Sequence, residues 1–473
     1  QRQMCIRDSH RHGGWGVKFV PEWGKNRLRG MLEARPDWCI SRQRSWGLPI
    51  PAFETADGMV FMTAASVRAV ATVIRAKGSD AWFSMSAAEL LAHYDYKNDP
   101  DLQEPLKEKF HGSSPFATVK KGGDILDVWF ESGSSWNAVM RQRGLGYPCD
   151  LYLEGSDQHR GWFQLSLLPA LGVTGQPPFK TLLTHGFMVD RDGRKLSKSR
   201  PDAHRYEVES VCTEFGMDVM RWWVSSLNYE NDVKVDVELF GLAGESYRKI
   251  RNTLRFMLSN LVDFEPSCEG KTGHCVDLSA ISPTSLDAWV LSQYNAMAAT
   301  VINAYETFDF KTVHKVIFDF CNGTLSAEYL AAIKDRLYCD AKDSPRRRQT
   351  QTVLWDLTDG LCRLLAPILC HTCDEAYRAL WKAADDDRCV HLEEFIAKFD
   401  VKASEQWAKA MAVKDQVKIA LEKAKGELAI ENPLDAGVTL SDEAGIFAGF
   451  DRVDLADVMG VSQVTIELSL IHI

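Results

Sequence analysis

Two lysines with a spacing suited to phosphate binding lie in the segment Lys195-Leu196-Ser197-Lys198-Ser199, just after the turn at Asp192-Gly193. Two cations three positions apart on a serine-rich loop can bring two positive charges to one polyphosphate. Serine also keeps such a loop short, polar and able to move. The same pattern is typical of a charged surface turn, so it predicts a nucleotide site only together with a second segment.

That second segment lies upstream, at Leu153–Phe163. It contains Glu154, Gly155, Asp157 and Gln158, and it ends in aromatic residues where a helix is expected to begin. Carboxylate and amide oxygens accept hydrogen bonds from an amino group and from ribose hydroxyls. The two segments together therefore predict a site for a nucleotide and an amine.

The elements around these segments follow an α/β pattern. Strands are predicted at Ile125–Phe130, Leu151–Leu153 and Thr181–Val189, with a helix at Gly161–Leu171. Short strands that alternate with helices favour a parallel sheet, and ligands bind such sheets at the carboxyl ends of the strands. Both segments directly follow a predicted strand.

The rest of the chain is predicted to contain more helices than strands. Helices are expected at Lys25–Glu33, at Ala64–Ala76 and Ala87–His93 within a small insertion, and then in a series of apolar stripes after residue 240. A last helix near Val413–Leu421 precedes strand-like pieces at Gly437–Leu440 and Val461–Ile466. The predicted division is 10–53, a small insertion at 54–120, an α/β part at 121–200, a linker at 201–240, an all-helical bundle at 241–400 and a junction region at 401–467.

The bulk composition is that of an ordinary globular protein, with 45% hydrophobic and 25% charged residues. The net charge of −10 does not suggest nucleic-acid binding, but large nucleic-acid enzymes carry their cations locally. Twelve cysteines without a regular framework suit free thiols in the cytoplasm. Cys370 and Cys373 lack a second ligand pair, so no metal site is expected. The ends, 1–9 and 468–473, match no neighbouring periodicity and resemble translated sequencing-adapter artefacts.

Four longer strings carry a resemblance to a known family. They are Asp37–Gly47, Asp127–Gly133, Glu154–Phe163 and His185–Phe187, and they occur in the order found in isoleucyl-tRNA synthetases, which are class I aminoacyl-tRNA synthetases. Valyl and leucyl relatives share the first and last strings only loosely, whereas Asp157-Gln158-His159-Arg160-Gly161-Trp162-Phe163 has the isoleucyl form. The resemblance implies the second half of a Rossmann-like catalytic domain, followed by an all-α helical-bundle anticodon-binding domain.

The resemblance also implies roles for the residues that match. Glu154 would bind the α-amino group of isoleucine, while Gly155, Asp157 and Gln158 would line the ribose side of isoleucyl-adenylate. Trp129 and Trp162 would form the walls of the aliphatic pocket, because an indole is flat and large in apolar area. His185 and Gly186 would lie beside ATP. Lys195 and Lys198 would be the catalytic lysines, and Lys198 the direct ligand of the ATP phosphates, with Mg²⁺ accompanying the ATP.

The same family implies tRNA as the macromolecular partner of a monomer. The candidate tRNA contacts are the local basic residues Arg42, Arg44, Lys334, Arg336, Arg346, Arg347 and Arg348. Tyr338 could stack on a base or belong to the core.

The chain departs from the family pattern at several points. The loop has Leu196 in place of methionine and continues as Arg200-Pro201-Asp202, where proline would stiffen it. The His-Ile-Gly-His signature, the editing insertion and the C-terminal zinc module are not found, so no structural zinc is expected. We therefore expect a fragment of an isoleucine–tRNA ligase that is inactive alone. The alternatives are a non-catalytic tRNA-binding protein derived from a synthetase and, on weaker grounds, a synthetase for valine or leucine.

Overall fold

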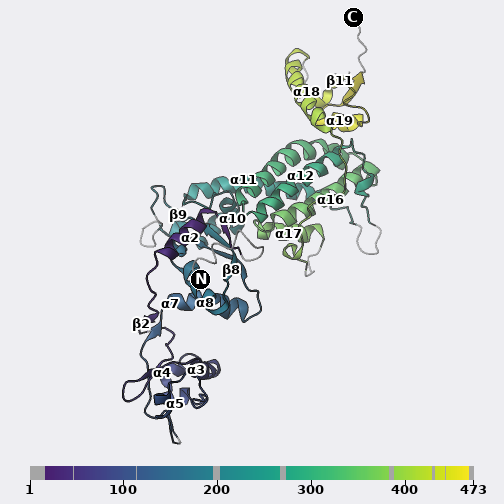
Figure 1. The fold of residues 1–473 in the computed structure, drawn as a ribbon. Coiled ribbons are helices and arrows are strands. Elements are labelled where there is room, and N and C mark those ends of the chain that lie inside the picture. The colour runs from purple at the N-terminus through teal and green to yellow at the C-terminus, as the bar shows by residue number, and fades with distance from the viewer. Residues whose placement is uncertain are drawn as a thin grey trace. The chain divides into compact units, whose positions relative to one another are not determined.

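The computed structural model describes residues 16–45, 47–112, 114–194, 196, 203–266, 273–382, 388–428, 432–442 and 444–467. They belong to two compact units (Figure 1). The first unit comprises Gln1–Phe187 with Tyr229–Asp232, and the second comprises Met188–Asn228 with Val233–Ile473. No helix of the described residues is both long enough and apolar enough to span a membrane.

The first unit is built on a parallel three-stranded sheet with the strand order β1-β8-β7. These strands are Lys18–Val20 (β1), Phe179–His185 (β8) and Cys149–Gly155 (β7). The predicted parallel pairing is confirmed, and β7 is longer than the predicted strand at both ends. The strand predicted at Thr181–Val189 was wrong after His185, because Met188–Val189 (β9) pairs instead with Val233–Lys234 (β10) in the second unit.

The strand predicted over Ile125–Phe130 was wrong in its second half. Only Ile125–Leu126 (β6) is extended, and Val128–Gly133 forms a helix (α7). Asp127 causes the change, because its side chain accepts a hydrogen bond from the Trp129 N–H and caps the first turn. A short apolar run does not distinguish a buried strand from a buried helix by periodicity.

The predicted helix at Gly161–Leu171 is confirmed as Trp162–Thr174 (α8). It packs closely against α7, because Gly133 leaves no room for a side chain: a Cβ atom there would overlap the Leu165 carbonyl. The other elements of this unit are Trp23–Glu33 (α2), Ser41–Arg42 (β2), Phe53–Glu54 (β3), Val60–Phe61 (β4), Ala64–Lys77 (α3), Ala81–Ser84 (α4), Ala87–Leu90 (α5), Glu104–Lys107 (α6), Lys120–Lys121 (β5), Trp136–Arg141 (η2) and Ser156–His159 (η3).

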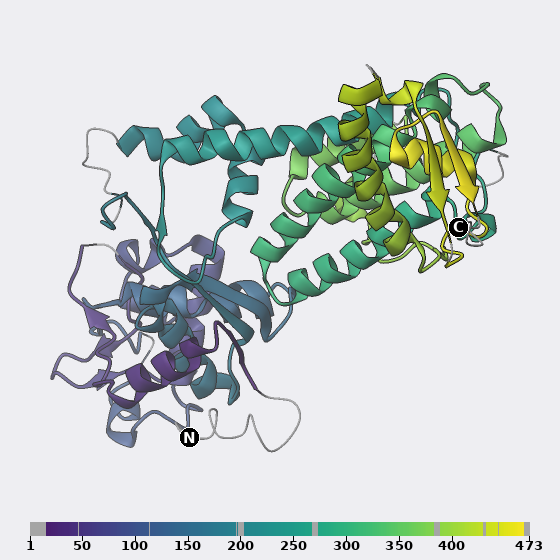
Figure 2. The ribbon, with the colours of Figure 1, turned by 90° about the horizontal axis from the view of Figure 1, so that it is seen from above.

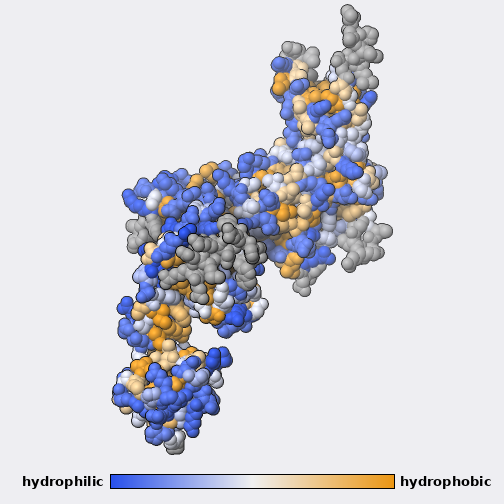
Figure 3. All heavy atoms as spheres, viewed as in Figure 1, coloured by the Kyte–Doolittle hydropathy of each residue, from blue (hydrophilic) through white to orange (hydrophobic). Residues whose placement is uncertain are grey.

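The small insertion has a hydrophobic core of its own, made of residues between Phe53 and Val119. Helix α3 begins with a capping box between Thr63 and Ser66. The buried carboxylate of Asp99 accepts hydrogen bonds from Thr63 (2.5 Å) and Tyr94 (2.6 Å). The surface of the small insertion is mostly hydrophilic in the view of Figure 3, as expected for a segment that buries its apolar residues internally.

The second unit is mainly helical and has one large core. Helices, and no strands, are described between residues 237 and 400, and the parallel pair Gly437–Ser441 (β11) and Gln463–Glu467 (β12) follows beside Trp407–Leu428 (α18) and Arg452–Met459 (α19) (Figure 2). The remaining elements are Ala203–Tyr206 (η4), Val208–Phe215 (α9), Met217–Ser225 (α10), Val237–Ser259 (α11), Leu278–Ala280 (η5), Leu286–Glu306 (α12), Phe310–Asp319 (α13), Phe320–Tyr329 (η6), Leu330–Ala332 (α14), Lys334–Tyr338 (α15), Pro345–Leu365 (α16), Cys370–Leu380 (α17), Val390–Leu392 (η7) and Pro433–Asp435 (η8).

His314 on α13 makes the stability of the second unit depend on pH. Its ring stacks on Trp222 with the centroids 3.8 Å apart and lies 3.2 Å from the Ser225 hydroxyl. Burial lowers the pKa of His314 to about 4. Because this value is below that of the unfolded chain, the contribution is fully present above pH ~6.5 and is lost as the pH falls toward 4.

We therefore expect the free energy of unfolding to fall by up to about 3 kcal/mol across this range. Urea unfolding of wild type and His314→Gln at several pH values would measure this. The variant should lose that part of the slope of the free energy of unfolding against pH. The same substitution at His371, which is exposed on α17, should leave the slope intact. An unchanged slope in His314→Gln would contradict the assignment.

Candidate functional site

The carboxyl ends of β7 and β8 bring two of the predicted segments to the same edge of the sheet. Glu154 pairs in register with Thr184, and Gly155 with His185. Glu154 is exposed, and its Oε2 accepts a hydrogen bond from the Gly155 N–H at 3.0 Å. The carboxylate is thus held at the edge where parallel sheets bind ligands.

The turn after β7 carries Asp157 and Gln158. A Cβ atom on Gly155 would lie 3.1 Å from Asp157 Oδ1 and 3.1 Å from the ring of Phe187. Glycine at this position therefore lets a carboxylate and an aromatic ring approach the backbone closely. Phe187 was not among the predicted site residues, although its string was part of the family resemblance.

The start of α8 gathers three of the predicted site residues. Gln158 Oε1 accepts a hydrogen bond from the Trp162 N–H at 2.8 Å. A Cβ atom on Gly161 would overlap this oxygen and would lie 3.2 Å from the Trp129 ring. Gln158, Trp129 and Trp162 thus converge at Gly161, where a larger residue would push them apart.

The two tryptophans differ in how firmly they are held. The Trp162 Nε1–H donates to the Ser132 carbonyl at 2.9 Å, and its ring stacks on Tyr152 with centroids 4.1 Å apart and planes 8° apart. Trp129 is 40% exposed on α7 and is fixed at its backbone by Asp127. An ordered indole beside a more exposed one can form a flat apolar wall.

His185 and Gly186 complete this edge of the sheet. His185 Nδ1 lies 2.7 Å from the Gly186 carbonyl oxygen, and the Gly186 N–H donates to the Tyr229 carbonyl at 2.8 Å. A Cβ atom on Gly186 would overlap the backbone of Asn231. The close approach of the Asn231 backbone therefore requires glycine at position 186.

Two residues hold the site residues in place and were not predicted from the sequence. His159 is fully buried between Trp23 and Phe163, and its Nδ1 lies 3.0 Å from the Ser156 carbonyl oxygen. Burial lowers the pKa of His159, so its ring is neutral at pH 7. It fixes the turn that carries Asp157 and Gln158.

The second is Asp127, whose Oδ2 accepts hydrogen bonds from Trp38 and Arg42, both at 2.8 Å. Asp127 directly precedes an apolar run in the sequence, and this position could have indicated that it caps a helix.

The predicted lysine pair is not placed. Lys195 and Lys198 lie outside the described residues, and only Leu196 of that segment is described. Among the residues that the structure describes, no group of three or more His, Cys, Asp or Glu side chains is placed so that it could hold a metal ion.

Most of the predicted tRNA-binding arginines are engaged in ion pairs within the protein. Arg42 pairs with Asp127 at 2.8 Å. Arg336 is 1% exposed and pairs with Asp454 at 2.7 Å, and Arg346 pairs with Asp457 at 2.5 Å. A residue as buried as Arg336 has no surface to offer RNA.

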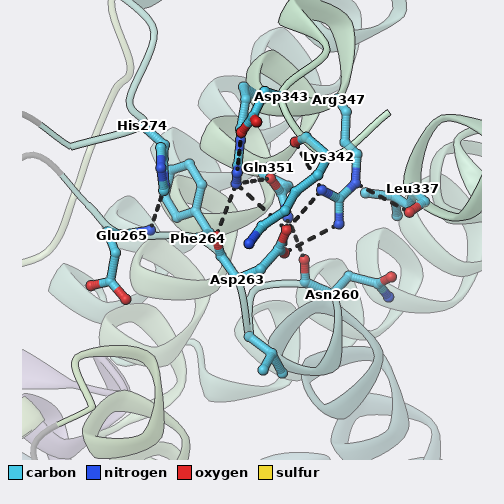
Figure 4. A network of polar contacts seen from close by, with 12 residues as sticks. Asn260, Asp263, Phe264, Glu265, His274, Leu337, Lys342, Asp343, Arg347 and Gln351 are labelled. Carbon is cyan, nitrogen blue, oxygen red and sulfur yellow. Dashed lines mark hydrogen bonds and ion pairs between the residues drawn. The ribbon is translucent and has the colours of Figure 1, made fainter. Parts of the chain in front are cut away.

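Arg347 belongs to the polar network of Figure 4, and Arg348 is held by neighbouring polar groups as well. Arg347 makes two hydrogen bonds to the carboxylate of Asp263, at 2.7 and 3.2 Å, and Arg348 pairs with Asp343 at 3.1 Å. Burial by itself would raise the pKa of Asp263, but the hydrogen bonds from Arg347 and Gln351 and the nearby positive charges lower it to about 2.

Three residues predicted near RNA remain accessible. Arg44 and Lys334 are exposed and form no ion pair with any residue that the structure describes. Tyr338 is 63% exposed and therefore does not belong to the core.

Comparison with known proteins gives two family matches. The family "tRNA synthetases class I (I, L, M and V)" matches residues 3–236, and "Anticodon-binding domain of tRNA ligase" matches residues 287–440. Proteins named isoleucine–tRNA ligase are similar over almost the whole chain. That of Desulfotalea psychrophila is 40% identical over 90% of this chain, that of Streptococcus pyogenes serotype M3 40% over 95%, and that of Geobacter sulfurreducens 41% over 91%.

The chain spans a little under half the length of these curated relatives, namely 44%, 46% and 45%. The catalytic-domain match covers the residues that form the β7–β8 edge, and the anticodon-binding match covers most of the helical part. The chain therefore belongs to the class I aminoacyl-tRNA synthetases, among the isoleucine–tRNA ligases.

Proposed function

We propose that this chain is the part of an isoleucine–tRNA ligase that binds isoleucyl-adenylate at the β7–β8 edge. The observation that carries the proposal is the register of this edge, which sets Glu154 and Gly155 beside Thr184 and His185. The whole enzyme would activate isoleucine with ATP, form isoleucyl-adenylate and transfer the isoleucyl group to the 3′ end of its tRNA.

The side chains at this edge suit the parts of that ligand. The Glu154 carboxylate would bind the α-ammonium group through charge-assisted hydrogen bonds, which are shorter and stronger than neutral ones. Trp162, held flat against Tyr152, and Trp129 would contact the branched side chain. Asp157 and Gln158 would accept hydrogen bonds from the ribose hydroxyls, and His185 with Gly186 would lie beside the adenine and phosphates.

The reaction requires no nucleophile from the protein. The carboxylate oxygen of isoleucine attacks the α-phosphorus of ATP, the bond to the bridging oxygen breaks, and pyrophosphate leaves. Catalysis of this step depends on positioning and on stabilisation of charge. Lys195 and Lys198 would supply positive charge to the phosphates, together with Mg²⁺.

Glu154→Gln should weaken binding of a non-hydrolysable isoleucyl-sulfamoyl-adenosine by roughly 10- to 100-fold, since a charge-assisted hydrogen bond contributes about 1.5–3 kcal/mol. Isothermal titration calorimetry on the chain measures this. Asp150→Asn is the matched control: it removes one carboxylate from the opposite end of β7, where Asp150 pairs with Lys180 at the surface, and should change nothing. An affinity of Glu154→Gln within about threefold of wild type would rule out the role.

A further inference from the structure

Three sulfur atoms meet where α9 ends and α10 begins. The Cys212 thiol lies in the last turn of α9, and its Sγ is 3.7 Å from Met217 Sδ and 3.8 Å from Met220 Sδ. Thiol and thioether sulfurs form only weak hydrogen bonds, and a single thiol proton here has two thioether sulfurs within reach. These side chains form the sulfur cluster (Cys212, Met217 and Met220), which none of the predicted sites includes.

The backbone between the two helices brings the sulfur atoms together. Gly216 ends α9 and precedes α10 with a φ of +94°, a conformation that favours glycine. Its N–H donates to the Cys212 carbonyl at 3.0 Å. Met217 and Met220 follow at positions i and i+3 of α10, so their side chains leave the helix on one side. The sequence spacing Cys-x4-Met-x2-Met thus becomes a compact cluster in the fold.

Both helices are held in place by contacts outside the sulfur cluster. On α10, the Asp218 carboxylate accepts a hydrogen bond from the Thr372 N–H at 2.7 Å, and Arg221 donates to the Ile368 carbonyl at 2.8 Å. On α9, Val211 is buried in a hydrophobic cluster. The three sulfur atoms are therefore close together before a ligand arrives, which lowers the ordering cost of binding.

The separations between the sulfur atoms suit a single metal ion. Metal–thiolate bonds are about 2.3 Å long in zinc sites, so two sulfur ligands of one ion lie about 3.8 Å apart in a tetrahedral arrangement and about 4.0 Å apart in a trigonal one. The separations of 3.7 and 3.8 Å are close to these values. Met217 is 40% exposed, so an ion can reach the cluster from solvent. Sulfur atoms in ordinary packing contact lie about as far apart, so the type of ligand atom must decide which ion fits.

We propose that the sulfur cluster binds one Cu(I) ion. Thiolate and thioether ligands select soft metals such as Cu(I), whereas zinc takes thiolate, imidazole and carboxylate ligands, almost always four in structural sites. One Cu(I) ion and one thiolate also make a neutral site, while a divalent ion would leave a net positive charge. On binding, the Cys212 S–H bond breaks, a Cu–S bond forms and the proton passes to solvent, and copper remains Cu(I) throughout.

Anaerobic titration of the reduced chain with Cu(I), in competition with the chromophoric chelator bicinchoninate, tests the sulfur cluster. The chain has twelve cysteines, so the informative variant leaves every thiol in place. Met217→Leu/Met220→Leu does so and conserves side-chain volume. One equivalent of Cu(I) should bind wild type at least about tenfold more tightly than this variant, since even the loss of groups that only orient metal ligands costs about 10- to 100-fold in affinity.

Two further variants complete the comparison. Cys212→Ser should lose the tightly bound equivalent. Met62→Leu/Met188→Leu also removes two exposed methionines but keeps the sulfur cluster, so it should bind Cu(I) like wild type. Equal affinity of wild type and Met217→Leu/Met220→Leu, or an equal loss in Met62→Leu/Met188→Leu, would overturn the proposal, because copper would then bind without these two thioethers.

The ligand atoms and the choice of metal have their own readouts. X-ray absorption at the copper edge, on the chain loaded with one equivalent, should show sulfur neighbours only, and nitrogen or oxygen neighbours would contradict the site. Zn(II) should bind wild type and Met217→Leu/Met220→Leu alike, because thioethers are not among its usual ligands. A preference of Zn(II) for wild type by about tenfold or more would overturn the assignment to Cu(I).

Discussion

Replacing Arg336 with alanine should lower the free energy of unfolding by about 3–5 kcal/mol, the usual cost of leaving a buried charge without its partner. Arg336 lies 2.7 Å from Asp454, 3.0 Å from Asp457 and 3.8 Å from Asp287, and it is 1% exposed. Its removal would leave three carboxylates in or near the core without their shared cation. These contacts connect α15 with α19, so the C-terminal α/β piece should detach from the helices first.

The other hydrogen bonds of Asp287 explain why a rearrangement of neighbouring side chains would not compensate for the loss of Arg336. Asp287 is fully buried and also accepts hydrogen bonds from Tyr329 at 2.6 Å and from Gln349 at 2.7 Å. These two neutral partners cannot balance its charge.

Urea unfolding of Arg336→Ala and of Lys334→Ala measures the difference. Lys334 is exposed on the same helix, so its variant should stay within about 0.5 kcal/mol of wild type. A similarly small effect of Arg336→Ala would show that the buried network does not stabilise the fold.

Gly133→Ala should destabilise the first unit by about 2–4 kcal/mol and weaken binding of the isoleucyl-adenylate analogue. The new methyl group would overlap the Leu165 carbonyl, which is backbone and cannot rotate away. Helices α7 and α8 would have to separate, and the bond between the Trp162 indole and the Ser132 carbonyl would stretch or break. Stability and binding should therefore fall together.

Gly172→Ala on α8 is the matched control. No atom lies within 4 Å of its added Cβ, and the position is exposed. Alanine in an exposed helix should stabilise the protein by about 0.5–1 kcal/mol. Thermal unfolding and calorimetry on both variants give the comparison, and a Gly133→Ala protein that matches wild type in both would contradict the tight contact between the helices.

The site could be predicted to the extent that it depends on local patterns. Glu154 and His185 each lie at the carboxyl end of an apolar strand, and parallel pairing brings such positions to one edge. The contribution of α7 was not predictable in the same way. The apolar run from Ile125 to Phe130 fits either a strand or a helix, and the outcome depends on a single capping side chain at Asp127.

The residues predicted to contact RNA show a different limit of prediction from sequence. A run of arginines in the sequence shows where cations are, but its partners lie far away along the chain: Arg336 pairs with Asp454 and Asp457 from a distant helix. Only the folded structure shows that these charges are neutralised.

The amino-acid selectivity of the β7–β8 edge tests the proposed isoleucyl-adenylate site most directly. Calorimetric titration of the chain with the isoleucyl, valyl and leucyl forms of the sulfamoyl-adenosine analogue compares three ligands that differ only in the aliphatic group. The isoleucyl form should bind most tightly, by about fourfold or more over the valyl form, since one buried methylene contributes about 0.8 kcal/mol. Tighter binding of the valyl or leucyl form, or equal binding of all three, would contradict it.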